Sequence, residues 1–252
     1  MTSDILSLQE VGHRFGGFAV LNSVSFSVPQ ASIVGLIGPN GSGKTTLFNI
    51  ISGYLAHRQG RVVFDGRELI DESVQRRSTA GMVRTFQTPK VFENMTVLEN
   101  IMVGATKLTH SGMLEDLACL GRSRGDLVRI EREADAVCTR FELDRVRHHK
   151  AHNLSAGQRR VLEIARAVIG KPRLLMLDEP SSGLNPNEIA NLRRWIKHLN
   201  ADGISILLVS HDMELMNVAS RVHALYFGEI IASGSMGEIQ NNAQVRDVYL
   251  GA

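Results

Sequence analysis

The chain has little of what marks several protein classes. Its 252 residues include one tryptophan, two cysteines and six prolines, and aromatic side chains make up 5%. Two cysteines, Cys119 and Cys138, are too few for a disulfide framework, so we expect free thiols in a reducing compartment. Neither sign of charge dominates, because 28 Lys and Arg face 26 Asp and Glu. This balance gives no charge-based argument for a nucleic-acid partner, and we predict none.

Long apolar runs and a basic leader are also missing. Crossing a bilayer takes roughly 18 apolar residues, whereas the longest runs here are strand-sized. The N-terminus carries an early acid, Asp4, and no basic segment, so we expect no secretory signal peptide. With 43% hydrophobic and 21% charged residues, the composition is that of a globular protein long enough to bury a core.

Strand-like runs alternate with stretches of helical period, which predicts an α/β fold with parallel strands at the centre of its sheet. The predicted strands are Ser32–Gly38, Arg61–Phe64, Leu174–Asp178, Ser205–Ser210 and Ala224–Phe227. Gly66 and Gly228 are expected in hairpin turns. Residues 88–153 lack strong strands and read as an inserted helical region, in which Glu131–Phe141 is the clearest helix.

A glycine-rich segment follows the first buried strand, and a helical pattern follows the segment. It matches G-x-x-x-x-G-K-[ST], in which the backbone curls so that N–H groups point at phosphate oxygens. Lys44 would reach the outer phosphates and the Thr45 hydroxyl would ligate Mg²⁺. The bland alternative is a structural glycine turn. The predicted phosphate-binding residues are Gly38, Pro39, Asn40, Gly41, Ser42, Gly43, Lys44, Thr45 and Thr46.

Two adjacent acids, Asp178 and Glu179, end the apolar strand Leu174–Asp178. Ligands of open α/β sheets sit beyond the carboxyl ends of the strands, so these acids should face the phosphates. Neighbouring positions on a strand point apart, so the two acids can have separate tasks. Asp178 suits the metal and Glu179 suits polarising an attacking water; a solvated strand end is the alternative.

A second small-residue segment, Asn153–Gln158, precedes the predicted helix Arg159–Ile169. Such a helix start can bind an anion, and it can equally be an ordinary helix cap. One nucleotide cannot easily use two such sites far apart on one chain. A second chain could supply the second site.

Taken in order, these segments together with Gln87, Ser182–Asn185 and His211 resemble the ATPase subunits of ATP-binding cassette (ABC) transporters over essentially the whole chain. The resemblance implies a P-loop NTPase core with a mostly parallel sheet, an N-terminal antiparallel β subdomain and an inserted α-helical subdomain. It makes Gln87 a ligand of Mg²⁺ and the attacking water, and His211 the γ-phosphate sensor. Metal ligands would be Thr45, Gln87 and Asp178; Glu179, His211 and Gln87 would be catalytic.

The same resemblance assigns nucleotide contacts outside the glycine-rich loop. Phe15 stands where an aromatic residue stacks on adenine in the family, with Val20 nearby. The signature motif would contribute Ser155, Ala156, Gly157 and Gln158, and it departs from the family's Leu-Ser-Gly-Gly-Gln at Ala156. The expected domain is single, with residues 1–87 and 160–252 forming the catalytic core and residues 88–159 the helical subdomain.

Three further stretches resemble the ATPase subunits of branched-chain amino acid importers. They are Arg84–Gln87, Phe92–Asn100 and the tail around Gly237–Ile239 and Tyr249–Gly251, and the Ala105–Asp126 insertion adds to them. The resemblance implies ATP and Mg²⁺ as ligands, transmembrane permease subunits as partners, and a homodimer or a heterodimer with a related ATPase. A substrate-binding protein would be an indirect partner, and the location cytoplasmic, on the inner face of the membrane.

Three alternatives remain open at this point. A lipopolysaccharide-export ATPase shares the same core. A soluble cassette ATPase acting on DNA or ribosomes usually has two cassettes or long coiled-coil insertions, which this sequence lacks. A P-loop small-molecule kinase would need an acceptor site and would not need residues 154–158.

Overall fold

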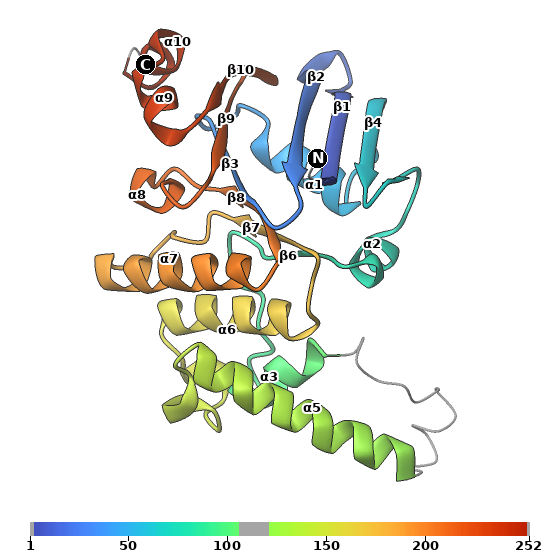
Figure 1. The fold of residues 1–252 in the computed structure, drawn as a ribbon, viewed down its shortest axis with the longest axis vertical. Coiled ribbons are helices and arrows are strands. Elements are labelled where there is room, and N and C mark those ends of the chain that lie inside the picture. The colour runs from blue at the N-terminus through green and yellow to red at the C-terminus, as the bar shows by residue number, and fades with distance from the viewer. Residues whose placement is uncertain (1–2, 106–120, 251–252) are drawn as a thin grey trace. The chain divides into compact units, whose positions relative to one another are not determined.

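The computed structural model describes residues 3–105 and 121–250 (Figure 1). Cys119, most of the Ala105–Asp126 insertion and Gly251 lie outside the described residues. Within those residues, no helix combines the length and apolar character that a membrane span requires.

The chain forms two compact units. The first comprises residues 1–87, 173–182 and 189–252, and the second comprises residues 88–172 and 183–188. The division expected after residue 159 differs from this grouping, because it falls inside the continuous helix α6 (Ala156–Ile169). The whole of α6 belongs to the second unit, where it packs against α3 (Val97–Val103) and α5 (Gly121–Arg140).

A six-stranded sheet in the first unit has the order β10-β9-β3-β8-β7-β6. Its strands β6, β7, β8, β3 and β9 are parallel to their neighbours, and β10 pairs antiparallel with β9. Every residue of β3, β7 and β8 is buried, as expected for central parallel strands covered on both faces. The predicted α/β class is therefore confirmed. The bounds are β3 Ile33–Ile37, β6 Met82–Arg84, β7 Leu174–Asp178, β8 Ser205–Val209, β9 Arg221–Tyr226 and β10 Glu229–Gly234.

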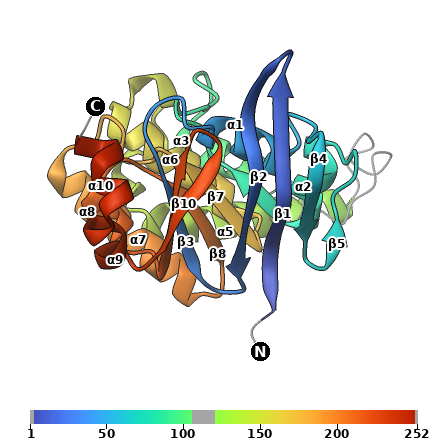
Figure 2. The same ribbon diagram turned by 90° about the horizontal axis from the view of Figure 1, so that it is seen from above.

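A four-stranded antiparallel sheet, order β2-β1-β4-β5, completes the β structure of this unit (Figure 2). Its strands are β1 (Asp4–Phe15), β2 (Phe18–Pro29), β4 (Gln59–Phe64) and β5 (Arg67–Glu68). Apolar residues of both sheets share one core with helix α1 (Lys44–Ser52). The predicted hairpin turns are present, since Gly66 joins β4 to β5 and Gly228 joins β9 to β10, both with positive φ.

The other helices of the first unit are short except for α7. Helix α7 (Pro186–Ala201) begins in the second unit and continues into the first, and its Trp195 is buried. The remaining helices are α2 (Val74–Ala80), α8 (Met213–Met216), α9 (Met236–Asn241) and α10 (Ala243–Leu250).

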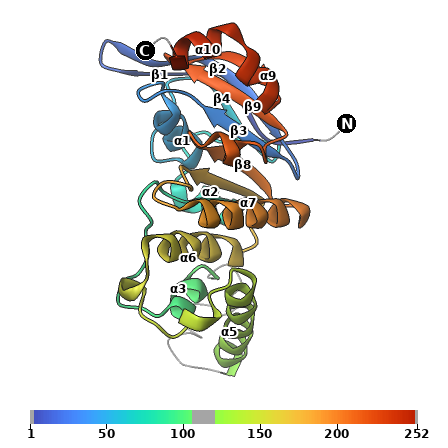
Figure 3. The ribbon, with the colours of Figure 1, turned by 90° about the vertical axis from the view of Figure 1, so that its left-hand side faces the viewer.

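The second unit is helical, with α3, α5 and α6 packed on one another and two short 3₁₀ turns at Asp144–Val146 and Ala151–Asn153 (Figure 3). Helix α5 begins ten residues before the predicted Glu131, because its polar, glycine-containing first half has no apolar period to reveal it. Cys138 on α5 is a free, buried thiol, and burial raises its pKa to about 11.

A buried histidine joins the two sheets of the first unit. His223 on β9 accepts or donates one hydrogen bond through Nδ1 to Ser233 Oγ at 2.7 Å, and its ring lies 4.9 Å from the Phe26 ring on β2. Its Nε2 has no hydrogen-bond partner among the described residues. Burial, and secondarily the charge of Arg221, lowers the pKa of His223 to about 4.

We predict that His223 makes the fold sensitive to acid. The folded pKa lies below the usual value of about 6.5, so the unfolded chain takes up a proton first as the pH falls. The contribution of neutral His223 to the free energy of unfolding is fully present above about pH 6.5. It is lost progressively towards pH 4, by up to about 3 kcal/mol. Urea unfolding at pH 7.5 and 4.5 should show the free-energy gap between wild type and His223→Gln shrinking at the lower pH. A gap that stays constant between the two pH values would contradict the prediction, and His198→Gln at an exposed position of α7 is the control for loss of a surface histidine.

Candidate active site

The glycine-rich loop, residues 38–43, connects the buried strand β3 to helix α1. Gly41 and Gly43 have φ values of 80° and 107°, in the left-handed region that favours glycine. A Cβ at Gly43 would also crowd Leu21 and the Val20 carbonyl. These two glycines let the backbone turn sharply and enter α1 with Lys44 and Thr45 in its first turn.

Several polar groups of this loop point towards a shared space. Lys44 Nζ donates to the carbonyls of Gly38 and Pro39, at 2.7 and 2.9 Å, so the ammonium lies over the loop. Burial lowers the pKa of Lys44, and the nearby charges of Glu179 and Asp178 partly oppose this effect. Helix α1 begins after Gly43, which has no side chain to cap the first-turn N–H groups. Ser42 Oγ is buried and has no hydrogen-bond partner among the described residues. The ammonium group, the uncapped N–H groups and the hydroxyl together suit the binding of an anion.

Strand β7 brings the two carboxylates to the carboxyl end of the parallel strands. Asp178 is its last residue, and Glu179 follows with φ 47°, an uncommon value for a non-glycine residue. The Glu179 N–H donates to the Val209 carbonyl at 2.9 Å, and the Ser182 N–H donates to the Glu179 carbonyl at 3.2 Å. These two hydrogen bonds stabilise the turn at which the side chains of Asp178 and Glu179 point in different directions.

His211 follows the neighbouring strand β8 and meets Glu179. His211 Nδ1 lies 2.8 Å from Glu179 Oε2, and the His211 N–H donates to the same oxygen at 3.2 Å. The histidine side chain is exposed, whereas that of Glu179 is mostly buried. Ser181 Oγ and Ser210 Oγ, in the segments that follow β7 and β8, share a buried hydrogen bond of 3.0 Å.

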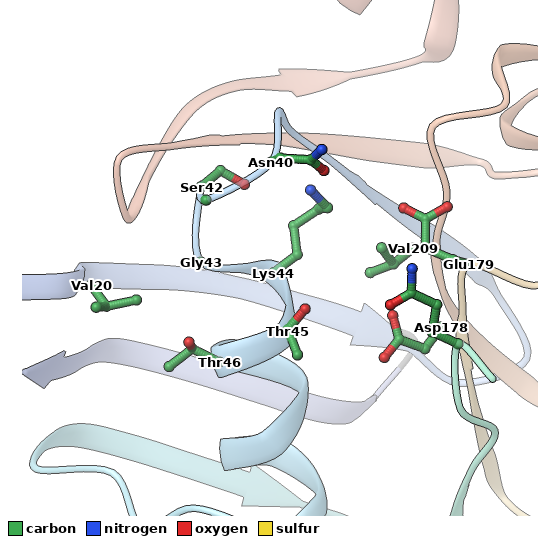
Figure 4. Close-up of a pocket in the computed structure, with 12 residues that line it drawn as sticks. Val20, Asn40, Ser42, Gly43, Lys44, Thr45, Thr46, Asp178, Glu179 and Val209 are labelled. Atoms are coloured by element: carbon green, nitrogen blue, oxygen red, sulfur yellow. The ribbon is translucent and has the colours of Figure 1, made fainter. Parts of the chain in front are cut away.

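The glycine-rich loop and the two acids line one cleft of about 220 Å³ in the first unit (Figure 4). His211 contacts Glu179 but is not among the lining residues. Figure 4 shows Lys44 and Thr45 on the α1 side and Asp178 and Glu179 on the opposite side. Phe15 does not line this cleft and is exposed, so its contact with adenine stays a prediction. The lining residues are Val20, Asn40–Thr46, Gln87, Asp178, Glu179 and Val209.

The donor set of this cleft fits Mg²⁺ bound together with phosphates. Thr45 offers a hydroxyl, Asp178 a carboxylate and Gln87 an amide oxygen, and all three line the same cleft. Mg²⁺ prefers hard oxygen ligands and usually takes only one or two carboxylates besides phosphate oxygens and water. These residues would hold the ion, which when bound neutralises charge on the phosphates.

The sequence-based interpretation of the site assigned no contact to Arg84, the last residue of β6. Its guanidinium donates to Asp178 Oδ2 at 2.8 Å, and the Arg84 and Asp178 side chains are 7% and 9% exposed. The run Arg84–Gln87 served only to indicate a family, because a single arginine in a strand does not reveal its partner. Val209, whose carbonyl fixes the Glu179 turn, was missed for the same reason.

The segment Ser155–Gln158 lies in the second unit, at the start of α6. Ser155 and Gln158 form a capping box, each side chain bonding the other's backbone N–H, at 3.1 and 3.0 Å. Ala156 is exposed in the first turn. A Cβ at Gly157 would overlap the carboxylate of Glu188, which also accepts the Asn185 N–H, so the Glu188 side chain would have to shift to admit one. The helix-cap interpretation of this segment is therefore correct as far as the single chain goes.

Comparisons with known proteins agree on one family. The family model described as "ABC transporter" matches residues 21–182, and the model described as "Branched-chain amino acid ATP-binding cassette transporter" matches residues 229–252. Similar curated proteins are the high-affinity branched-chain amino acid transport ATP-binding proteins LivG of Salmonella typhimurium and BraF of Pseudomonas aeruginosa. They are 38% and 35% identical, and each alignment covers 100% of this chain and 99% of the relative.

Solved structures show the same fold. A nucleotide-free ATP-binding cassette from an ABC transporter superposes with a TM-score of 0.85 at 30% identity, covering 99% of this chain and 100% of that one. An ATP-binding cassette of an ABC transporter in its ADP conformation gives 0.84 at 30% identity, with complete coverage of both chains.

We predict that Lys44→Ala weakens ATP binding about tenfold or more. The reason is the loss of a charge-assisted hydrogen bond to the phosphates, and such bonds are typically worth about 1.5–3 kcal/mol. The measurement is equilibrium titration with ATP, and Lys197→Ala on the exposed face of α7 is the control for loss of a lysine charge. Unchanged affinity in the Lys44 variant would remove the phosphate-binding role from the loop.

Proposed function

The chain belongs to the ATP-binding subunits of ABC transporters, and we propose that it hydrolyses ATP to power the import of branched-chain amino acids or related small solutes. The observation that carries the ATPase part is the cleft lined by the glycine-rich loop, Asp178 and Glu179, with His211 in contact with Glu179. The substrate class is supported by full-length similarity to LivG and BraF and by the match at residues 229–252.

Glu179 is the general base of the proposed reaction. Its Oε2 is engaged by His211, which leaves Oε1 to accept a proton from the attacking water. The strained turn and the backbone bond to Val209 hold the carboxylate in place, so little reorganisation is needed at the moment of reaction. Lys44 and the backbone N–H groups of the loop stabilise the charge on the transferred γ-phosphoryl group and on the departing ADP.

Two ATPase subunits pair head to tail in the proposed active form. Each nucleotide lies between one chain's loop 38–45 and residues Ser155–Gln158 of its partner, which is a second copy or a related chain. In support, the loop and this segment belong to different compact units of one chain. The exposed start of α6 also presents first-turn N–H groups, and these suit a γ-phosphate. ATP then stabilises the closed pair, and hydrolysis removes the contacts that hold it.

Residues 88–104 form the proposed docking surface for a permease subunit. Asn100, fully buried, organises this segment by accepting the Phe92 N–H at 2.8 Å and donating to the carbonyls of Phe92 and Thr96. The organised turn leaves Phe92 and Met95 exposed, and such apolar side chains suit a helix-in-groove contact. The subunit would therefore lie on the cytoplasmic face of the membrane, with the substrate-binding protein reached only through the permease.

The relatives support an importer over the alternatives of a lipopolysaccharide exporter, a soluble cassette ATPase and a small-molecule kinase.

We predict that this chain, co-purified with its permease subunits and reconstituted in vesicles, drives ATP-dependent uptake of leucine. Lys44→Ala in the same assembly should abolish uptake. ATPase stimulation by DNA or ribosomes, or phosphoryl transfer to an added metabolite, would instead favour a rival class.

We predict that Glu179→Gln lowers the steady-state ATPase rate by about 10²–10³-fold, because a general base typically contributes 10²–10⁴-fold. ATP binding should persist, since Lys44 and the loop are unchanged. Size-exclusion chromatography with ATP should therefore trap the closed pair, whether the partner is a second copy or a related ATPase chain. Adding Ser155→Arg to this variant should prevent trapping. Near-wild-type turnover would refute Glu179 as the base, and trapping despite Ser155→Arg would refute the head-to-tail pair.

A further inference from the structure

Arg84 connects three elements of the first unit at a buried point. One end of its guanidinium donates to Asp178 Oδ2 at 2.8 Å, and the other donates to Asn49 Oδ1 at 2.7 Å and Ser52 Oγ at 3.0 Å. The Arg84 side chain is 7% exposed, and its guanidinium carbon lies 5.4 Å from the Phe48 ring centre and 5.3 Å from that of Phe86. Arg84 is thus a well-packed junction with defined geometry.

The elements that meet at Arg84 are those that carry the predicted metal ligands. Asn49 and Ser52 are on α1, whose first turn contains Thr45. Asp178 ends β7, which pairs with β6 in a register that puts Arg84 opposite Met176. Gln87 follows Arg84 by three residues in the same segment. The Arg84 side chain therefore contacts the helix that carries Thr45 and binds Asp178 directly. It also belongs to the segment that leads to Gln87.

The energetics of this pair argue for a positioning role. Taking an arginine and an aspartate out of water costs several kcal/mol per ion, and buried ion pairs often contribute no net stability. Arginine cannot lose its charge, and its planar fork can bridge two groups in fixed directions. Asp178 also lines the cleft, so holding Oδ2 limits the directions that its second oxygen can take.

We propose that Arg84 is a positioning residue for Mg²⁺: it fixes Asp178 relative to α1, so that Asp178 and Thr45 bind the ion of the ATP complex together. This inference rests on the proposed ATP-binding function. Arg84 itself does not line the cleft, so it would act through Asp178 rather than by contact with the ion or the nucleotide. Its positive charge alone would oppose cation binding, so a favourable effect of Arg84 on Mg²⁺ affinity must come from geometry.

The test separates geometry from charge and from general stability. Arg84→Lys keeps the charge but cannot bridge Asp178 and Asn49 in the same way, and Arg84→Gln removes both. The matched control is Arg77→Lys, because Arg77 is also buried and donates to the α1 carbonyls of Ile50 and Ile51 but does not line the cleft. Each variant is saturated with a fluorescent ATP analogue without metal and titrated with Mg²⁺, and the metal-free affinity for the analogue is measured separately.

We expect the Mg²⁺ concentration for half-saturation to rise about tenfold or more in Arg84→Lys and in Arg84→Gln, with metal-free affinity within about twofold of wild type. Arg77→Lys should lower thermal stability while leaving the Mg²⁺ titration unchanged. Wild-type Mg²⁺ affinity in Arg84→Lys, tighter Mg²⁺ binding in Arg84→Gln, or a parallel loss of metal-free affinity would each overturn the inference. If wild type itself binds no ATP analogue, the proposed function fails instead. If Arg84→Gln does not fold, Arg84→Lys alone decides the outcome.

Discussion

The order of four parallel strands is the constraint on which the site depends. Strands β6, β7, β8 and β3 lie side by side and run in the same direction, so their carboxyl ends meet at one edge of the sheet. The ends of these strands and the segments that follow them carry Gln87, the two acids, His211 and the glycine-rich loop respectively. Open α/β sheets bind ligands at this edge because strand ends and helix starts leave backbone and side-chain groups unpaired there.

Charge at this edge is arranged in pairs rather than as isolated groups. Asp178 is held by Arg84, Glu179 by His211, and Lys44 lies over loop carbonyls in the field of both acids. Burial makes an unpaired charge costly, which explains why each of these groups has a defined partner. The positive φ of Glu179 adds local strain that the backbone bond to Val209 supports, a feature that is common where function fixes a side chain.

The helical unit achieves its geometry by different means. Helices α3 and α6 start at capping boxes, Thr96 with Glu99 and Ser155 with Gln158, and the buried Asn100 holds the turn before α3. The same residues that cap α6 are those proposed to face a partner's nucleotide. A helix start can serve both purposes because a capping box satisfies only some of the first-turn N–H groups. The methyl of Ala156 is exposed there, where it does not disturb packing within the chain.

What the sequence determined by itself was local. The loop 38–45, the acids after a buried strand, the hairpin turns at Gly66 and Gly228 and the α/β class all follow from spacing and periodicity over a few residues. The pairing of Arg84 with Asp178, the fit of Gly157 against Glu188, the hydrogen bond between His211 and Glu179 and the extent of α5 were decided only by tertiary structure. Each of these depends on a partner distant in the chain or on packing in three dimensions. The hydrophobic periodicity of the sequence reveals neither the order of the strands nor which polar side chains pair in the interior.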